Sequence, residues 1–462
     1  MPTIAPDAAA PYAPARPADA PTHSPPGTPT YMPPPAPAPW PLPLRIGFRF
    51  AAAWLVLVND LLGPALGQLP GLSWLVGKYA EVRAPLLTWV GAHVLHTAAP
   101  AVELPNGAGD KTVFWVGQLV TLVLAVAIAA VWSVLDRRRT EYRKAHDWLR
   151  VYVRYALGVT MLGYGAFKVI KLQFPAPTLT ALLRPYGESS PMGILWKLMG
   201  HSYGYNLFTG LAEAVPAAML FWRRTTTLGA LLLVAALANV FALNMAYDVT
   251  VKGYSLELLL MAGFLLLPEL RRLWDVLVLH RAVPAQPLGE PFARPGLRRA
   301  ARVLHPLVAL YLIATPFWGA WRYARQGGAE GPPVPLFGIY EVESFQRNGM
   351  ELPPLTTDPV RWRRFVVDRR GAFTVQAMSD SLLRYRGTVD TAAARIAFAP
   401  MTDSTRRTVL HYVREEGDRL RIAGVSGTDS IAARLRRVDH TRFTLLARDR
   451  QFHWVQDDNF NR

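Results

Sequence analysis

Long apolar stretches, separated by short polar and basic segments, run through the middle of the chain. Residues 121–135 include no charged residue, and residues 228–243 include a single polar side chain, Asn239. A helix on the surface of a soluble protein would carry a polar stripe, whereas a membrane-spanning helix needs about 20 mostly apolar residues. We therefore predict seven membrane-spanning helices, at residues 44–63, 112–135, 151–172, 204–222, 227–247, 254–270 and 301–321.

A different pattern begins after residue 333. Apolar and charged residues alternate there in short runs, as at residues 337–345, and turn residues separate the runs. Alternation with a period of two is typical of strands that bury one face, and several such strands at regular spacing predict an all-β domain. We expect roughly eight strands, and therefore a small C-terminal antiparallel β-barrel or sandwich at residues 336–462. Residues 442–449 and 451–455 are expected to form its last strands.

Proline dominates the start of the chain, where residues 1–43 hold 16 of the 40 prolines. Proline lacks a donor N–H and restricts the residue before it, so this composition predicts a disordered or polyproline II tail. The chain is thus expected to have three parts. They are a Pro/Ala-rich tail (1–43), a transmembrane helical domain (44–325) and the all-β domain (336–462).

The formal net charge is +17, and its distribution predicts an orientation in the membrane. Lys and Arg concentrate in residues 136–150, at Arg223 and Arg224, and in residues 269–302. Connections rich in Lys and Arg stay in the cytoplasm, and these three share one side if the spans alternate. We therefore expect a bacterial inner-membrane protein with a cytoplasmic N-terminus and a periplasmic β domain. The lipid bilayer, rather than a nucleic acid, is the partner that these charges favour.

The long connection at residues 63–111 leaves two interpretations open. Residues 72–98 within it are amphipathic, which predicts a helix lying at the membrane interface. The alternative is an additional short span, which would invert the orientation of everything that follows.

Several classes of chemistry have no support in this sequence. The chain has no Cys, which excludes disulfides and thiolate chemistry. It carries none of the motifs typical of nucleotide binding or of hydrolases, and nothing in it indicates haem or flavin. His93 and His96 are spaced for one helix face, but the sequence offers no nearby third ligand except Glu103, so we predict no metal site.

Ionisable and amide side chains inside the predicted spans are the candidates for function, because polar groups are costly in a membrane. Glu213 falls near the midplane of its span, and Lys168 lies where it could reach Glu213. We predict Glu213 and Lys168 as catalytic residues. The predicted ligand-binding residues are Asn206, Asn239, Asn244 and Asp248. The alternative for the acid and the amides is a structural hydrogen bond between helices, and for the lysine a position that reaches the interface.

Residues 150–273 resemble the DoxX family of bacterial membrane proteins. The resemblance rests on a Gly-rich helix that ends in Lys, from Gly165 to Lys168, and on a Gly-x-x-Glu helix, from Gly210 to Glu213. It implies a four-helix membrane unit. The family takes its name from a subunit of a thiosulfate:quinone oxidoreductase, which implies quinone as the cofactor or substrate.

Three functions follow as hypotheses, and the residues leave open whether the protein is an enzyme. The first is a subunit of a quinone-linked oxidoreductase, in which Glu213 exchanges a proton, Lys168 holds the quinone and a redox subunit supplies electrons. The second is a non-enzymatic scaffold whose β domain recruits a periplasmic protein. The third is a small-solute carrier, for which inverted repeats or broken helices would be expected.

Overall fold

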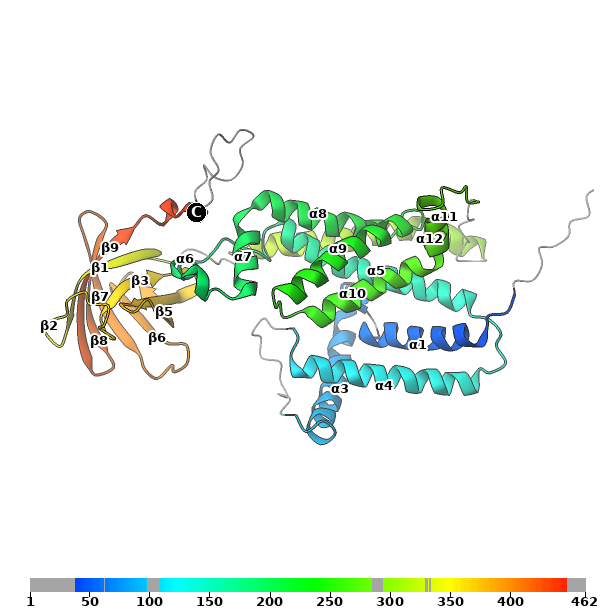
Figure 1. Ribbon diagram of the computed structural model, residues 1–462, viewed down its shortest axis with the longest axis horizontal. Coiled ribbons are helices and arrows are strands. Elements are labelled where there is room, and N and C mark those ends of the chain that lie inside the picture. Colours follow the sequence, from blue (N-terminus) through cyan, green and yellow to red (C-terminus); the bar gives the residue numbers. More distant parts are fainter. Residues whose placement is uncertain are drawn as a thin grey trace, which may run out of the picture.

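The computed structural model describes residues 38–61, 63–97, 109–284, 294–328, 331 and 334–446. Most of the predicted tail therefore lies outside the described residues, as does the end of the predicted β domain. Figure 1 shows a bundle of helices with a β-barrel at one end of it.

The long helices of the bundle run along one direction (Figure 1). They are α1 (Leu42–Val58), α4 (Thr112–Leu135), α5 (Arg143–Val169), α8 (Tyr203–Met219), α9 (Thr226–Ala246), α10 (Lys252–Leu266) and α12 (Pro295–Arg325). Shorter helices connect them, namely α2 (Gly63–Gly67), α6 (Leu179–Leu183), α7 (Pro191–His201) and α11 (Leu270–Leu277). Each predicted span therefore coincides with one of the long helices.

Among the residues that the structure describes, four helical segments are long and apolar enough to cross a membrane, namely Thr112–Leu135, Thr226–Ala246, Lys252–Leu277 and Pro295–Arg325. These segments indicate insertion into a bilayer. Helices α1 and α8 are 17 residues long, slightly shorter than a typical span. Helix α5 is long enough but carries charged side chains. The number of spans predicted from the sequence, seven, thus exceeds the number that length and hydropathy alone support.

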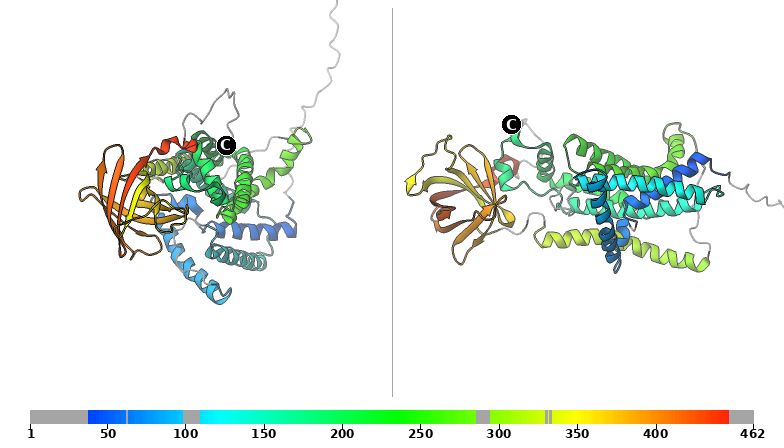
Figure 2. Two further views of the ribbon diagram at one scale, coloured as in Figure 1. Left: turned by 60° about the vertical axis from the view of Figure 1, so that its left-hand side comes forward. Right: turned by 90° about the horizontal axis from the view of Figure 1, so that it is seen from below.

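Helix α3 (Ser73–His93) runs across the direction of the bundle, as the two views in Figure 2 also show. It leaves Trp74, Val82 and Trp89 exposed, and it is not among the four candidate spans. This direction favours the prediction of an interfacial helix over that of an additional span.

Helix α5 lies at the centre of the bundle and buries Val153, Leu157 and Leu162 against its neighbours. Arg154 is also buried there, and its guanidinium donates to the carbonyl oxygens of Leu220 (2.7 Å) and Phe221 (2.9 Å) just past the end of α8. The final carbonyls of a helix lack partners within the helix and carry partial negative charge. Arg154 of α5 therefore caps the C-terminal end of α8.

The C-terminal domain is a closed antiparallel barrel of eight strands. The strands are β1 (Gly338–Arg347), β3 (Trp362–Val367), β4 (Ala372–Ala377), β5 (Leu382–Asp390), β6 (Arg395–Pro400), β7 (Thr408–Glu415), β8 (Arg419–Ser426) and β9 (Asp429–Val438). Each pairs with the next, and β1 pairs with β9 to close the ring, while β2 (Met350–Glu351) only extends β1. Closure leaves the ring without unpaired edges, so the domain is a barrel and not a sandwich.

Alternating positions of these strands fill the barrel. Phe345, Phe365, Phe373 and Phe398 are almost completely buried and stack against one another and against Trp362. One prediction here was wrong, because residues 440–446 form two 3-10 turns and not the start of a strand. The predicted strand at residues 451–455 lies outside the described residues.

Helix α6 fastens the barrel to the bundle. The hydroxyl oxygens of Thr180 and Thr374 are 2.8 Å apart, and the backbone N–H of Thr180 donates to Asp368. Around them Leu179 packs with Ile339 and other apolar residues of the barrel. The barrel thus lies at the end of the bundle where α5 ends and α8 begins (Figure 1).

Candidate functional site

A cavity of about 680 Å³ lies in the bundle, between α5, α7, α8, α9 and α10. Most of its wall is aliphatic or aromatic. The polar side chains that line it are Tyr164, Lys168, Gln173, Tyr205, Thr209, Glu213, Asn239, Asn244, Tyr254 and Ser255. Concave, mostly apolar sites with a few convergent polar groups are typical of small-molecule binding.

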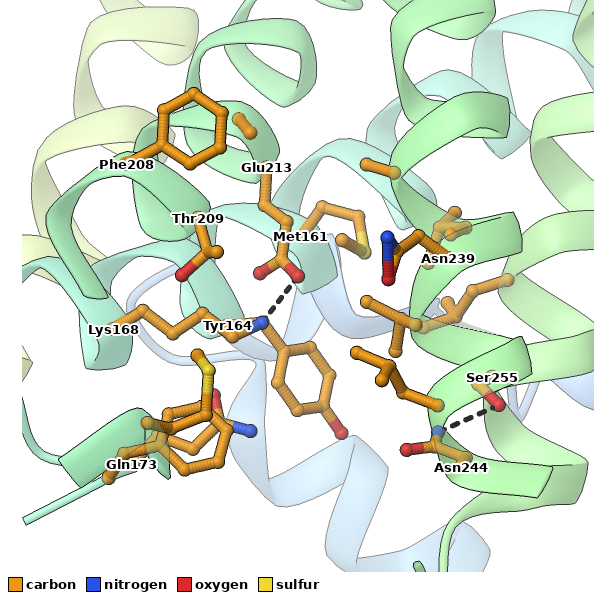
Figure 3. Close-up of a pocket in the computed structure, with 18 of the residues that line it drawn as sticks. Met161, Tyr164, Lys168, Gln173, Phe208, Thr209, Glu213, Asn239, Asn244 and Ser255 are labelled. Atoms are coloured by element: carbon orange, nitrogen blue, oxygen red, sulfur yellow. Dashed lines mark hydrogen bonds and ion pairs between the residues drawn. The ribbon is translucent and has the colours of Figure 1, made fainter. Parts of the chain in front are cut away.

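An ion pair between Lys168 and Glu213 forms part of the wall (Figure 3). Both residues are buried, with 6% and 3% of their surfaces exposed. The Lys168 ammonium donates to Oε1 of Glu213, whereas Oε2 has no hydrogen-bond partner among the described residues. Desolvating two charges is expensive even when they pair. The structure thus shows Glu213 paired with Lys168 and beside a cavity.

Two glycines set the distance between the helices that carry this pair. A Cβ at Gly210 would lie 2.9 Å from the backbone nitrogen of Val169, and a Cβ at Gly165 would lie 2.9 Å from the carbonyl oxygen of Gly210. Only glycine permits this approach of α5 to α8. The helices are antiparallel and each Cβ points toward the start of its own helix, so Lys168 and Glu213 lean toward each other.

Two of the predicted ligand-binding residues reach the cavity. Asn239 lies across it from Glu213, and Asn244 lies further along α9, where its amide donates to the hydroxyl of Ser255 at 3.1 Å (Figure 3). The amide of Asn239 is on the exposed side of α9. Four of the six predicted site residues, Lys168, Glu213, Asn239 and Asn244, therefore line one cavity.

The other two predicted ligand-binding residues are outside the cavity lining. Asn206 is fully buried, but its amide donates to the carbonyls of Met199 and Ser202 and so fixes the junction between α7 and α8. Asp248 follows the end of α9, where its side chain is 82% exposed and pairs with Lys252 at 2.7 Å. Sequence position alone had grouped both residues with the site, because each lies near the end of a predicted span, at 204–222 or 227–247.

Aromatic and amide residues that the sequence analysis had not singled out complete the wall. Tyr164 and Tyr254 line the cavity, and the centroids of their rings are 6.4 Å apart. Gln173, which follows α5, has a buried carbonyl oxygen with no partner among the described residues. A signal existed for Tyr164, because it precedes Lys168 by four residues and so shares its helix face.

The flank of the cavity between α8 and α9 faces the outside of the bundle. The two helices touch near their connection, where a Cβ at Gly229 would lie 2.7 Å from the carbonyl oxygen of Pro216. Lining residues on both helices are also exposed outward, with 66% of Phe208 and 42% of Leu232 accessible. In a bilayer this flank would meet lipid.

Metal ligands do not gather in the described part of the chain, where no three His, Cys, Asp or Glu side chains lie close enough to hold an ion. The ring nitrogen Nδ1 of His93 lies 3.0 Å from the carbonyl oxygen of Trp89, one turn earlier on α3.

Comparison with known proteins gives one distant similarity. The chain is 29% identical over 125 residues to a Bacillus subtilis protein named Uncharacterized protein YwoB. The matched region covers 27% of this chain and 78% of that protein. No protein-family model matches the chain, and no solved structure matches it. The name of the Bacillus protein states no activity, so the site has to be interpreted from its own geometry.

Proposed function

We propose that this protein is a bacterial inner-membrane protein of the DoxX type that binds a quinone in the cavity, as a subunit of a quinone-linked oxidoreductase. The observation that carries the proposal is the buried Lys168–Glu213 pair in the wall of a mostly apolar cavity of about 680 Å³. A structural ion pair alone would not require space beside it.

The lining supplies what a quinone headgroup needs. The ring packs against aliphatic and aromatic side chains, and a ring carbonyl accepts a hydrogen bond from the Lys168 ammonium, which has three N–H donors. The Asn239 amide, on the opposite wall, orients the other side of the ring. Glu213 keeps one oxygen without a partner, so it can exchange the proton that accompanies reduction or oxidation of the ring. Electrons come from a separate redox subunit.

The outward flank of the cavity supports a ligand that arrives through the bilayer. Phe208 and Leu232 border this flank and are exposed where lipid would lie. A quinone with an isoprenoid tail can leave the tail in the lipid while its ring enters between α8 and α9. A small water-soluble solute would have no use for an opening on this side.

The proposal includes a topology of seven spans, formed by α1, α4, α5, α8, α9, α10 and α12. The described parts of the basic connections, residues 136–150, 223–224, 269–284 and 294–302, lie at the end of the bundle opposite the barrel, which supports a periplasmic barrel. Reporter fusions after Arg143 and Arg299 are expected to be active on the cytoplasmic side, and a fusion after Arg462 on the periplasmic side. A cytoplasmic signal after Arg462 would refute this topology.

Quinone binding is tested on the full-length protein purified in mild detergent. Native mass spectrometry is expected to detect a retained quinone, and a short-chain quinone analogue is expected to quench the fluorescence of Trp196, which lines the cavity. Lys168→Met and Glu213→Gln are expected to weaken the quenching roughly tenfold or more, since each removes a charged hydrogen-bonding group. Asp248→Asn is the control, because Asp248 lies outside the lining. Equal binding by all four proteins, or no binding by any, would contradict the proposal and favour the scaffold hypothesis.

A further inference from the structure

Besides Glu213, another acidic residue is buried in the bundle, and one of its carboxyl oxygens has no hydrogen-bond partner among the described residues. Glu257 lies on α10 with 7% of its surface exposed, and its Oε1 has no hydrogen-bond partner among the described residues. It does not line the cavity. A buried carboxylate without hydrogen bonds is costly, so its presence calls for an explanation that packing does not provide.

Glu257 lies close along α10 to a tyrosine of the cavity wall. Tyr254 precedes Glu257 by one turn of α10 and lines the cavity. The centroid of its ring is 6.4 Å from that of Tyr164 on α5. Tyr164 is in turn one helical turn from Lys168 (Figure 3). A series of titratable side chains therefore leads from Glu257, through two phenols, to the wall that holds the Lys168–Glu213 pair.

The other side of Glu257 approaches the surface where α3 lies. Asp60, just past α1, and Arg83 of α3 are close enough to act electrostatically on Glu257. They pair with each other at 3.2 Å and are 47% and 35% exposed, so water reaches them. Tyr79 and Tyr152 also lie within electrostatic range of Asp60. Glu257 is thus situated between the cavity and a hydrated ion pair.

We propose that Glu257 exchanges protons between the cavity and the water beside α3. The proton of the Glu257 carboxyl passes toward Tyr254 and Tyr164, whose hydroxyls each release one proton as they accept another, and reaches Glu213 through water in the cavity. Glu257 then takes a proton from water beside Asp60. Only O–H bonds break and form, one proton enters for each that leaves, and no electron moves. Chains of acidic groups serve as proton relays in membrane proteins. The inference rests on the proposed role of Glu213 as the proton-exchanging group.

The test follows protonation of Glu213 directly and needs no quinone. After a rapid drop in pH, time-resolved infrared spectroscopy of the full-length protein records the rise of carboxyl C=O bands, and the band missing in Glu213→Gln identifies that residue. In Glu257→Gln the rise of this band is expected to slow roughly 100-fold, the order of effect that a positioned acid or base produces. Tyr254→Phe is expected to slow it in the same direction, and Asp248→Asn is expected to leave it unchanged.

Each outcome decides between distinct statements. If Glu257→Gln does not fold, Tyr254→Phe carries the test, because it removes only the hydroxyl. An unchanged rate in the folded variants would overturn the relay while leaving quinone binding intact. Slowed protonation in a protein that binds no quinone analogue would instead support the relay and refute the proposed function.

Discussion

The barrel and the bundle both bury polar side chains, but they differ in how those side chains are satisfied. In the barrel, the buried groups have partners, as when Arg361 donates to the carbonyl oxygen of Leu352 and Thr408 pairs with the hydroxyl of Ser426. All the buried side-chain atoms that lack a partner among the described residues belong to the helical part. They are in Arg45, Arg150, Gln173, Asn206, Glu213 and Glu257.

This difference separates a region built for stability from one that contains a site. Aromatic rings fill the barrel, and burial of their apolar surface stabilises it. In the bundle, two of the side chains with unmet hydrogen-bonding capacity, Gln173 and Glu213, line the cavity. Buried polar groups are normally satisfied, and exceptions point to function, ligand or water. The following predictions test whether the contrast is real, from the largest expected effect to the smallest.

Lys168→Met is expected to destabilise the protein by about 3–5 kcal/mol, because it leaves Glu213 buried without its partner. Combining it with Glu213→Gln is expected to recover much of the loss, since the double variant leaves no uncompensated charge. Unfolding in mild detergent measures both. The matched control is Arg434→Met in the barrel, which removes a partly exposed pair with Glu415 and is expected to change stability little, because water screens exposed ion pairs. Equal losses in the two regions would break the contrast.

Gly210→Ala is expected to cost about 1–3 kcal/mol, because the new methyl would overlap the backbone of α5. It would also separate Lys168 from Glu213 and so weaken binding of a quinone analogue. Gly163→Ala provides the control on the same pair of helices, since a Cβ there meets nothing within 4 Å. A Gly210→Ala protein as stable as the Gly163→Ala protein would show that the close approach of α5 and α8 is not required.

Thr180→Val is expected to cost about 0.5–1.5 kcal/mol, the usual net value of one hydrogen bond, because it removes the contact with Thr374. The loss should appear as faster amide exchange in β4 and not in the interior of α5, since the hydrogen bond joins the two regions without supporting either core. Faster exchange throughout the bundle would contradict the view that α6 serves mainly as a fastener.

Asp429→Asn tests the seam of the barrel and should have the smallest effect. Hydrogen bonds from Arg347 and Asn348 hold the pKa of Asp429 below its usual value of 3.8. A carboxyl with a lowered folded pKa adds stability above its unfolded pKa and loses it as the pH falls through the folded one. The free energy of unfolding of the wild type should therefore exceed that of the variant at pH 5 to 7. The difference should vanish in stronger acid, where Asp429 is protonated.

Urea unfolding of residues 336–462, produced without the helices, is the measurement for Asp429. This fragment is itself expected to give a β-type circular dichroism spectrum and a cooperative transition, because it closes its own sheet and core. A helical or unfolded fragment would show that the barrel depends on α6 for more than its position.

The sequence predicts the long elements of both regions well, because their patterns are periodic and uninterrupted. It misses β5, whose residues 382–390 bury almost nothing and so lack the apolar alternation that identifies a strand. It also misses α6 and α7, which are too short to show a period. These omissions explain why Asn206 was placed in the site, since it lies one turn into α8 and bonds back to α7.

The core of the site was predictable for a physical reason. Glycines three residues before Lys168 and Glu213 mark the faces on which two helices can meet, and those faces carry the charges. Asn239 and Asn244 were predicted because they are amide side chains inside the predicted span that became α9. Tyr254 and Gln173 could not be assigned this way, because a tyrosine near the end of a span is common at any membrane interface.

Helices α6 and α7 connect the docking of the barrel to the wall of the cavity. Seven residues separate them, and while α6 holds the barrel, α7 contributes Leu195, Trp196 and Met199 to the cavity wall. The ring of His201 at the end of α7 also lies 2.8 Å from the carbonyl oxygen of Leu445, beyond β9. If a ligand shifts α7, it changes the free energy of barrel docking, and reciprocity requires that whatever binds the barrel changes ligand affinity by the same factor. A second protein that binds the barrel would then change how much of the cavity is occupied by ligand.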